Sequence, residues 1–362
     1  MKLIRLCIMS LIFLLPTNLQ AMEHSKPLML QDDYYKEYWE QYFLFEDGSF
    51  VTSQFLIANL PWPVGKHHGI MIATVVTPDG KRTIIKNGRG PDEWGFDKEK
   101  FDLFIHVHRL KSDGNKHEIR IGRKDGNWTN TNVTSPEIPR YLQRYDKKKI
   151  YMESSFYMPF VEGQGQWSIL DEATQNIVTG GGKVQGFGTH VIFNGRTEKL
   201  LKNWLRVFGL QAEGNDQPVP FLSSIKRSDG SEDTILTLRD SDNDITEFSN
   251  ITLKYKDIKK GNNHSTYPMV IEVTARNDTA SLIGTIRFTR KIDHFNINEH
   301  MNFFERNFAI SRASVANYRY IADYDLSYVT EKGTTKLTGK ALSEYKDILP
   351  PKKKKSKRRK RR

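Results

Sequence analysis

The chain is poor in cysteine: Cys7 is the single cysteine among its 362 residues. It lies in the first apolar run, so the rest of the chain has no thiol for a disulfide, a thiolate nucleophile or a cysteine-bound metal. Two catalytic motifs are missing as well. The sequence has no G-x-S-x-G nucleophile turn, and no Lys-Ser or Lys-Thr pair follows the glycine-rich stretch 180–188, as a phosphate-binding loop requires.

The body of the chain also lacks a net charge. Lys and Arg number 55 against 43 Asp and Glu, but ten basic residues fall between Lys352 and Arg362, and Lys2 and Arg5 lie near the start. The remaining 43 basic residues balance the 43 acidic ones, so no basic face for nucleic acid is expected on the fold. We expect the tail 350–362 to be disordered. It either contacts an anionic membrane surface or has no specific role, and sequence-specific nucleic-acid binding is not indicated.

Long hydrophobic runs are absent too. The run Leu6–Leu15 is about half as long as a membrane-spanning helix needs to be. It follows two basic residues and precedes Leu19-Gln20-Ala21, which is typical of a secretory signal peptide over residues 1–21. A short membrane anchor is the alternative. Because an exported chain without disulfides suits a bacterial periplasm, we expect a periplasmic or envelope-associated protein.

What the chain does contain is β-strand patterning. Apolar residues alternate with polar ones in many short segments, and Asp-Gly, a strong hairpin-turn signal, occurs five times. This pattern predicts an all-β antiparallel fold, a barrel or a sandwich. Two segments differ: residues 297–308 have helical spacing behind a capping box at Asn296 and Glu299, and the apolar residues of 201–208 fit a helix or a strand.

Glycine is concentrated in the stretch from Met158 to Gly209, where aromatic and β-branched residues separate the glycines. A glycine inside a strand marks a bulge, a barrel corner or the close approach of another backbone. A flexible linker is the alternative, but linkers lack so many bulky residues. We therefore predict a structured junction between two β-domains, 22–185 and 186–349.

Several short motifs resemble those of the CrtC/AttH-type lipocalin-like family, which includes the carotenoid 1,2-hydratases. They are P-F-x-x-G-x-G, G-x-G-x-H, W-x-x-x-x-G and T-G-x-A-x-x-E-Y, carried here by Pro159, Phe160, Gly163, Gly165, Gly186, Gly188, His190, Trp204, Gly209 and Thr338 to Tyr345. The resemblance covers residues 39–345. It implies two lipocalin-like antiparallel β-barrel domains in tandem.

The resemblance also indicates where chemistry would occur. In the family's hydratases an acid and a histidine follow the paired glycines, and such a pair can protonate an alkene and orient water. Here Val191 and Ile192 occupy those positions, which leaves His190 and Asn194 as candidate catalytic residues. The hypothesis is therefore an exported, non-catalytic protein that binds a lipid or an isoprenoid. The alternative is a hydratase-like enzyme that hydrates, isomerises or cyclises an apolar isoprenoid.

Aromatic residues supply the candidate ligand-binding positions. Tyr318, Tyr320 and Tyr324 share one face of a predicted strand, and with Trp167 and Trp204 they form either the core or the wall of a cavity for an apolar molecule. No cofactor is expected, and no metal site. His106 and His108 provide at most half a site if they lie on one strand.

Overall fold

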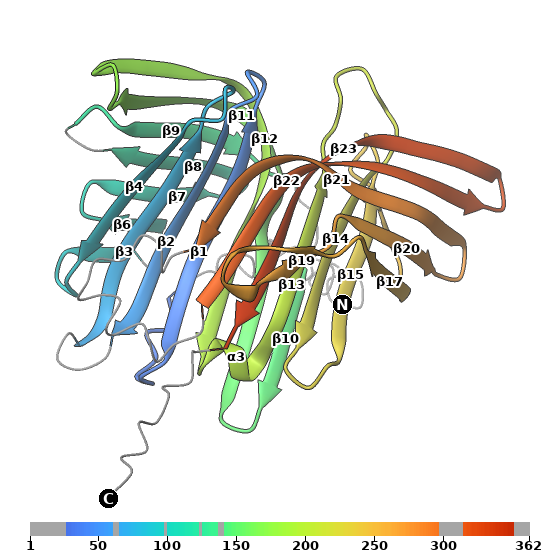
Figure 1. Cartoon of the computed structure of the whole chain (residues 1–362), viewed down its shortest axis with the longest axis horizontal. Helices are drawn as coiled ribbons and strands as arrows, with labels where there is room; N and C mark the ends of the chain where they lie inside the picture. The colour runs from blue at the N-terminus through green and yellow to red at the C-terminus, as the bar shows by residue number, and fades with distance from the viewer. Residues whose placement is uncertain are drawn as a thin grey trace, which may run out of the picture.

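The computed structural model describes residues 27–60, 65–97, 100–122, 125–136, 141–296 and 314–350. These residues form two large antiparallel sheets that follow one another along the chain (Figure 1). The expected signal peptide, the helix over 297–308 and the basic tail from residue 351 lie outside the described residues. No helix within the described part is long and apolar enough to span a membrane.

The first sheet is a nearly closed barrel of twelve strands. Its strands lie in the order β4-β3-β2-β1-β12-β11-β9-β8-β7-β6-β5, and β10 pairs with β11 outside this path. The strands are β1 (Tyr35–Phe45), β2 (Phe50–Leu60), β3 (Gly65–Val76), β4 (Arg82–Arg89), β5 (Trp94–Asp97), β6 (Phe101–Ile105), β7 (His108–Asp113), β8 (Lys116–Gly122), β9 (Trp128–Thr134), β10 (Leu142–Lys147), β11 (Ile150–Asp171) and β12 (Asn176–Asn194).

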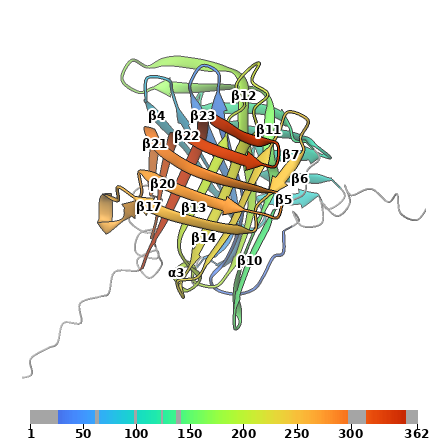
Figure 2. The ribbon, with the colours of Figure 1, turned by 90° about the vertical axis from the view of Figure 1, so that its right-hand side faces the viewer.

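The second sheet has nine strands in the order β16-β15-β14-β13-β23-β22-β21-β20-β17 and forms a half-barrel. This sheet curls strongly: in Figure 2, β20 to β22 run across the direction of β13 and β14. The strands are β13 (Leu201–Gly209), β14 (Val219–Arg227), β15 (Glu232–Arg239), β16 (Ile245–Glu247), β17 (Asn250–Lys256), β20 (Val270–Arg276), β21 (Ala280–Asn296), β22 (Ser314–Thr330) and β23 (Gly333–Leu349). A two-stranded ribbon, β18 (Lys259–Lys260) and β19 (Thr266–Tyr267), encloses the short 3-10 helix η1 (Asn262–His264).

The all-β, two-unit architecture expected from the sequence is confirmed. The predicted boundary between residues 185 and 186 lies inside β12, and the chain passes to the second sheet between Asn194 and Leu201 through the single-turn helix α3 (Thr197–Leu200). The ambiguous segment 201–208 is a strand, β13. The idea that His106 and His108 share one strand is wrong, because His106 lies in the turn between β6 and β7 with a positive φ of 55°.

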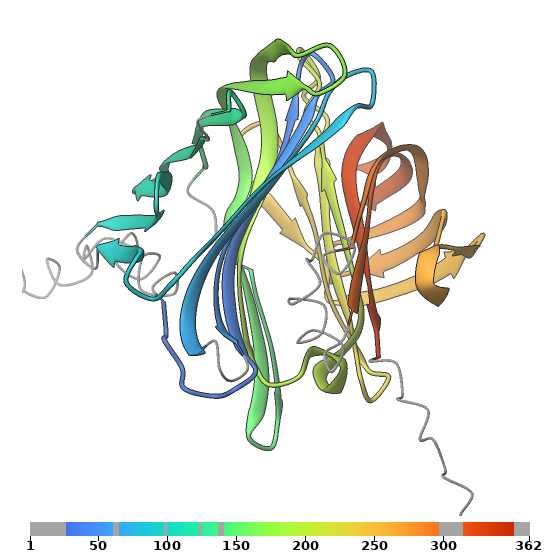
Figure 3. The same cartoon turned by 60° about the vertical axis from the view of Figure 1, so that its left-hand side comes forward.

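Each sheet encloses its own apolar core, and two further apolar clusters lie between the sheets. Figure 3 shows the first sheet curving around its interior beside the second sheet. One intersheet cluster contains aromatic residues of both sheets, among them Phe156, Phe160 and Phe187 of the first and Phe208 and Phe221 of the second. The two domains are therefore joined by a buried, largely aromatic interface.

The glycines of β12 are explained by close approach of neighbouring strands. Gly186 pairs with Phe43 of β1, and a Cβ atom at position 186 would overlap the carbonyl oxygen of Tyr42. Beside it, β11 pairs with β12 through two register shifts, between Ser155 and Met158 and between Met158 and Val161. Bulges and the close approach of another backbone, two of the three features that the glycine pattern indicated, are thus both present.

Replacement of Gly186 by alanine is expected to lower the free energy of unfolding by about 1–3 kcal/mol, because the new methyl group would push β12 away from β1. Urea unfolding followed by tryptophan fluorescence measures this loss. Gly88→Ala in β4 is the control, since a Cβ there meets nothing within 4 Å, and its effect should stay within about 0.5 kcal/mol. If both variants lost the same free energy of unfolding, the close contact with Tyr42 would not be the reason for a glycine at position 186.

Candidate functional site

Strand β1 carries polar residues on both of its faces. Successive side chains of a strand point to opposite sides, so Tyr35, Glu37 and Trp39 face the interior of the first sheet, whereas Tyr38 and Glu40 face the second sheet. Glu37 and Glu40 are both buried. Each carboxylate is therefore the centre of a separate polar cluster.

The inner cluster contains the predicted catalytic residue His190. Its ring stacks on Trp39 with ring centroids 4.6 Å apart, and its Nε2 lies 2.7 Å from Oε1 of Glu37. The other oxygen of Glu37 accepts hydrogen bonds from the backbone N–H of Leu28, at 2.8 Å, and from the hydroxyl of Tyr35. Burial, and then the Glu37 carboxylate, raise the pKa of Tyr35, so this hydroxyl keeps its proton.

The structure therefore supplies an acid for His190 that the sequence reasoning missed. The resemblance places the acid beside the histidine on one strand, but here Glu37 reaches it from the neighbouring strand. The signal in the sequence was a glutamate between two inward aromatic residues, Tyr35 and Trp39, where alternation predicts an apolar residue. The predicted partner Asn194 lies four residues further along β12, about 13 Å away along the strand. Its side-chain oxygen is buried and has no hydrogen-bond partner in the described part of the chain.

The outer cluster lies between the sheets and is centred on Arg206 of β13, which is 1% exposed. Its guanidinium donates to Oε2 of Glu40 at 2.9 Å and to Thr189 at 3.0 Å, both in the first sheet. Its Nε donates to Oε2 of Glu344 on β23 at 3.0 Å. Arg206 thus links a carboxylate of each sheet.

Further buried charges extend this cluster. Lys346 donates to Oε2 of Glu40 at 2.7 Å, while Arg319 donates to Glu344 at 3.2 Å and to Asp293 at 2.9 Å. We call these residues the charge cluster: Glu40, Arg206, Asp293, Arg319, Glu344 and Lys346. Three positive and three negative side chains balance, which a buried set of charges requires.

Burial and neighbouring charges set the pKa values in the charge cluster. Burial alone would raise the pKa of Glu40, but Lys346 and Arg206 outweigh it and lower the pKa. The pKa of Glu344 is also lowered, since Arg206 and Lys346 outweigh its burial. Burial, and then repulsion from Arg206, lower the pKa of Lys346. Both glutamates are therefore carboxylates, and the lysine releases its proton more readily than an exposed lysine does.

One side of the charge cluster borders a cavity of about 240 Å³ between the sheets, which we call the intersheet cavity. Its polar lining includes Glu40, Asn317, Arg319 and Lys346. Its apolar lining includes Tyr38, Leu56, Ala58, Ile70, Ile72, Phe193, Trp204 and Ile348. The oxygen of the Asn317 side chain is buried and has no partner within the described segments. The intersheet cavity thus combines apolar walls with polar and charged groups.

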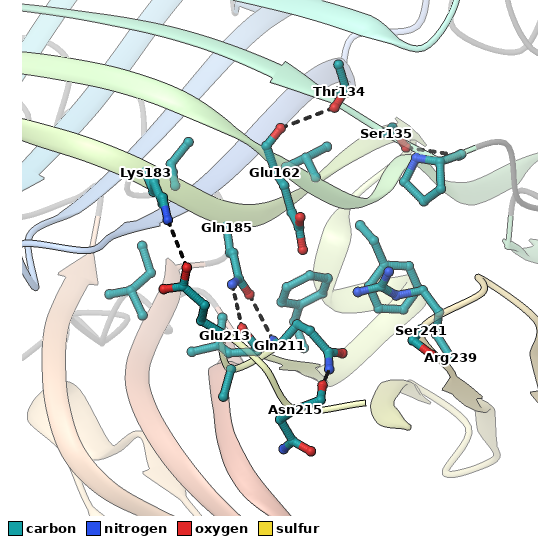
Figure 4. A pocket seen from close by; sticks show the side chains of 18 of the residues that line it. Thr134, Ser135, Glu162, Lys183, Gln185, Gln211, Glu213, Asn215, Arg239 and Ser241 are labelled. Atoms are coloured by element: carbon teal, nitrogen blue, oxygen red, sulfur yellow. Dashed lines mark hydrogen bonds and ion pairs between the residues drawn. The ribbon is translucent and has the colours of Figure 1, made fainter. Parts of the chain in front are cut away.

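A second, larger cavity of about 760 Å³ lies at the opposite ends of β1, β12 and β13, and we call it the rim cavity (Figure 4). Its walls include Glu162, Gln185 and the loop after β13, and Arg239 projects into it. It is more open and more polar than the intersheet cavity, and it does not reach the charge cluster.

The predicted ligand-binding aromatics fall into two groups. Trp204 lines the intersheet cavity, and its Nε1 donates to Ser223. Trp167 belongs to the core of the first sheet, with its Nε1 bonded to Ser49 at 2.7 Å. Tyr318, Tyr320 and Tyr324 do share one strand face, and all three pack into the core of the second sheet. None of these tyrosines lines either of the two cavities. Within the described ranges, no group of three or more His, Cys, Asp or Glu residues could hold a metal.

A barrel-like sheet followed by a half-barrel, docked through a buried interface, defines a tandem lipocalin-like fold of the AttH/CrtC type. The fold is similar to CghA, with a TM-score of 0.61 and 10% identity over 89% of this chain and 90% of CghA. It is similar to a protein described as AttH from Nitrosomonas europaea, with a TM-score of 0.51 and 11% identity. The match covers 86% of this chain and 92% of that protein. For kievitone hydratase from Nectria haematococca the TM-score is 0.50 and the identity is 9%. The match covers 90% of this chain and 91% of the hydratase.

At such low identities these likenesses show a shared fold alone. No protein-family model and no curated protein sequence matches the chain. The fold expected from the short sequence motifs is thereby confirmed, while the chemistry has to be argued from the residues of this chain.

Replacement of Glu344 by glutamine is expected to lower the free energy of unfolding by about 3–5 kcal/mol, because it leaves Arg206 and Arg319 with too little negative charge. Equilibrium urea unfolding measures the loss. Asp323→Asn is the control: it breaks an exposed pair with Lys340 and should change stability very little.

The pH dependence gives a second readout of the same variant. Because the folded-state pKa of Glu344 is lowered, its stabilising effect is complete above the pKa of an unfolded glutamate, about 4.3. The effect is lost as the pH falls toward the folded-state value. Glu344→Gln should therefore lose less stability than the wild type between about pH 6 and about pH 3. If the free energy of unfolding fell equally with pH in both proteins, the lowered pKa of Glu344 would be contradicted.

Proposed function

We propose that the protein binds an apolar small molecule of lipid or isoprenoid type in the intersheet cavity. The observation that carries this proposal is a cavity between two docked sheets whose lining is mainly apolar and includes buried members of the charge cluster. Such cavities at domain interfaces are common small-molecule sites. The names of the similar structures agree with it: one structure of CghA contains Sch210972, and kievitone hydratase is named for a small molecule.

The polar end of the cavity indicates what the molecule carries. The side-chain oxygen of Asn317 is a hydrogen-bond acceptor without a partner in the described region, and Lys346 offers an ammonium group shared with Glu40. A hydroxyl group would donate to the Asn317 oxygen and accept from Lys346, and the hydrocarbon part would lie against Ile70, Ile72 and Trp204. A fully saturated hydrocarbon would leave the amide unsatisfied, at a cost of about 1–3 kcal/mol.

Native mass spectrometry of the full chain, purified gently from its own source, is expected to show one bound apolar molecule that lipid extraction recovers. Ala58→Phe should abolish the bound molecule, because the ring would occupy the intersheet cavity that Ala58 lines. Ala173→Phe, in the exposed turn between β11 and β12, makes the same change outside both cavities and should retain it. A wild-type protein without a bound molecule, or an Ala58→Phe protein that keeps it, would contradict the proposal.

A second candidate function is proton-transfer catalysis on the bound molecule, by hydration, isomerisation or cyclisation. The observation that favours it is Lys346, a buried ammonium group with a lowered pKa at the end of the cavity and beside the carboxylate of Glu40. A poised acid next to a fixed base is what such reactions require. The pair of His190 and Glu37 has the same chemistry, but it lies on the inner face of β1 and lines neither cavity.

In heavy water, the bound molecule should gain deuterium when incubated with the wild-type protein. Lys346→Met should slow this labelling by about 100-fold or more, because general acid catalysis contributes at least that much. Lys340→Met, on the exposed part of the same strand, is the control. Labelling that survives Lys346→Met but is lost in His190→Ala would place the chemistry inside the first sheet. No labelling by folded wild-type protein would leave the protein as a carrier.

Export and membrane contact are part of the proposal. We propose that residues 1–21 direct the chain to the periplasm and that the basic tail holds it near an anionic surface, where the apolar ligand would be exchanged. The composition of both ends supports this location.

A further inference from the structure

We propose that the rim cavity is a second binding site, which takes a molecule with one carboxylate on an apolar body, and that Arg239 binds the carboxylate. The site is independent of the intersheet cavity. It lies at the C-terminal end of β1, next to residues 44–46, whereas the intersheet cavity borders residues 34–40.

Arg239 is buried and held in a fixed position. Its exposed fraction is 9%. The guanidinium carbon lies 4.5 Å from the ring centre of Phe160, and Nη1 donates to Oδ1 of Asn243 at 2.8 Å. Stacking on a ring and one hydrogen bond orient the planar group without neutralising it.

The opposite edge of the guanidinium has no partner in the described part of the chain. Nε is buried without a hydrogen bond, and Nη2 makes none with the described residues. Nε and Nη2 form the edge that pairs with a carboxylate through two parallel hydrogen bonds. A buried donor left unpaired costs about 1–3 kcal/mol, so the geometry favours a bound acceptor.

The charges around Arg239 favour a single negative charge over a doubly charged phosphate. Glu162 and Asp240 are close enough to stabilise the guanidinium, although burial, the larger effect, lowers the pKa of Arg239. Glu213, which is paired with Lys183 at 3.3 Å, also lines the cavity, and so do Glu46 and Asp216. With carboxylates already near, a dianion would meet more repulsion than a monoanion.

The remaining walls are suited to an apolar body. Four apolar residues line the cavity: Leu44, Phe160, Phe208 and Leu210. The loop wall is fixed by Gln185, which donates to the carbonyl of Gln211 at 2.6 Å and accepts from its N–H at 2.9 Å (Figure 4). An open cavity that combines an apolar wall with one unpaired guanidinium edge suits a fatty or isoprenoid acid.

Isothermal titration of the full chain with laurate, and with dodecanol as its neutral counterpart, tests the site. Arg239→Gln should weaken laurate binding by about 10-fold to 100-fold, the range expected for hydrogen bonds to a charged group, and should leave dodecanol binding unchanged. Arg239→Lys keeps the charge but loses the paired donors, so its effect should be intermediate. Arg276→Gln, at an exposed position on β20, is the matched control.

Three results would overturn the proposal. The first is that the wild-type protein does not bind laurate saturably. The second is that a folded Arg239→Gln protein binds laurate as tightly as the wild type. The third is that laurate binding is lost in Ala58→Phe but kept in Arg239→Gln. Circular dichroism of each variant checks folding. If Arg239→Gln does not fold, the proposal is tested with Arg239→Lys and with a crystal structure of the wild-type protein bound to laurate. In that structure the carboxylate must lie within hydrogen-bond distance of Nε and Nη2 of Arg239.

Discussion

The buried guanidinium of Arg206 is the constraint on which the arrangement of the two sheets depends. An uncompensated charge at this depth would be strongly destabilising, so the sheets can dock only where each brings a carboxylate to it: Glu40 from one and Glu344 from the other. The aromatic residues between the sheets supply apolar contact, which has little directional preference. The aromatic residues therefore supply the attraction, and the charge cluster selects one register among many that would bury similar area.

This central contact also determines where cavities can form. The interface is closed around Arg206, Tyr42 and Thr189, and the intersheet and rim cavities lie toward the two ends of β1. The two ends differ in character. At one end the lining belongs mainly to regular strands, and Glu40, Arg319 and Lys346 are held there by ion pairs of the charge cluster. At the other end a loop forms one wall, and Arg239 keeps one edge of its guanidinium unpaired among the described residues. Fixed polar groups require no reorganisation when a ligand arrives, which favours both ends as binding sites.

The sequence predicted the strands and the crowded glycines well, because alternation and close backbone approach are local effects. It could not decide segment 201–208. Leu205 and Val207 pack into the second core while Trp204 and Phe208 pack toward the first sheet, so both faces are apolar and no period separates helix from strand. The charge cluster could not be predicted from the sequence for a different reason. Its partners are far apart in sequence, such as Arg206 and Glu40, separated by 166 positions, and only the topology brings them together.

The acid beside His190 shows why a motif read along one strand can mislead. Adjacent residues of a strand face opposite sides, so position 191 points into the interface, where Val191 packs among apolar residues of both sheets. An aspartate there would lie on the far side of β12 from the inward-facing ring of His190. In this chain Glu37 takes the inward position on β1, and Glu40, three residues later, takes the outward one. Strand β1 is paired on both sides along its length, so both carboxylates are held on a rigid element. The alternation along one central strand therefore places one carboxylate beside His190 inside the first sheet and the other in the charge cluster between the sheets.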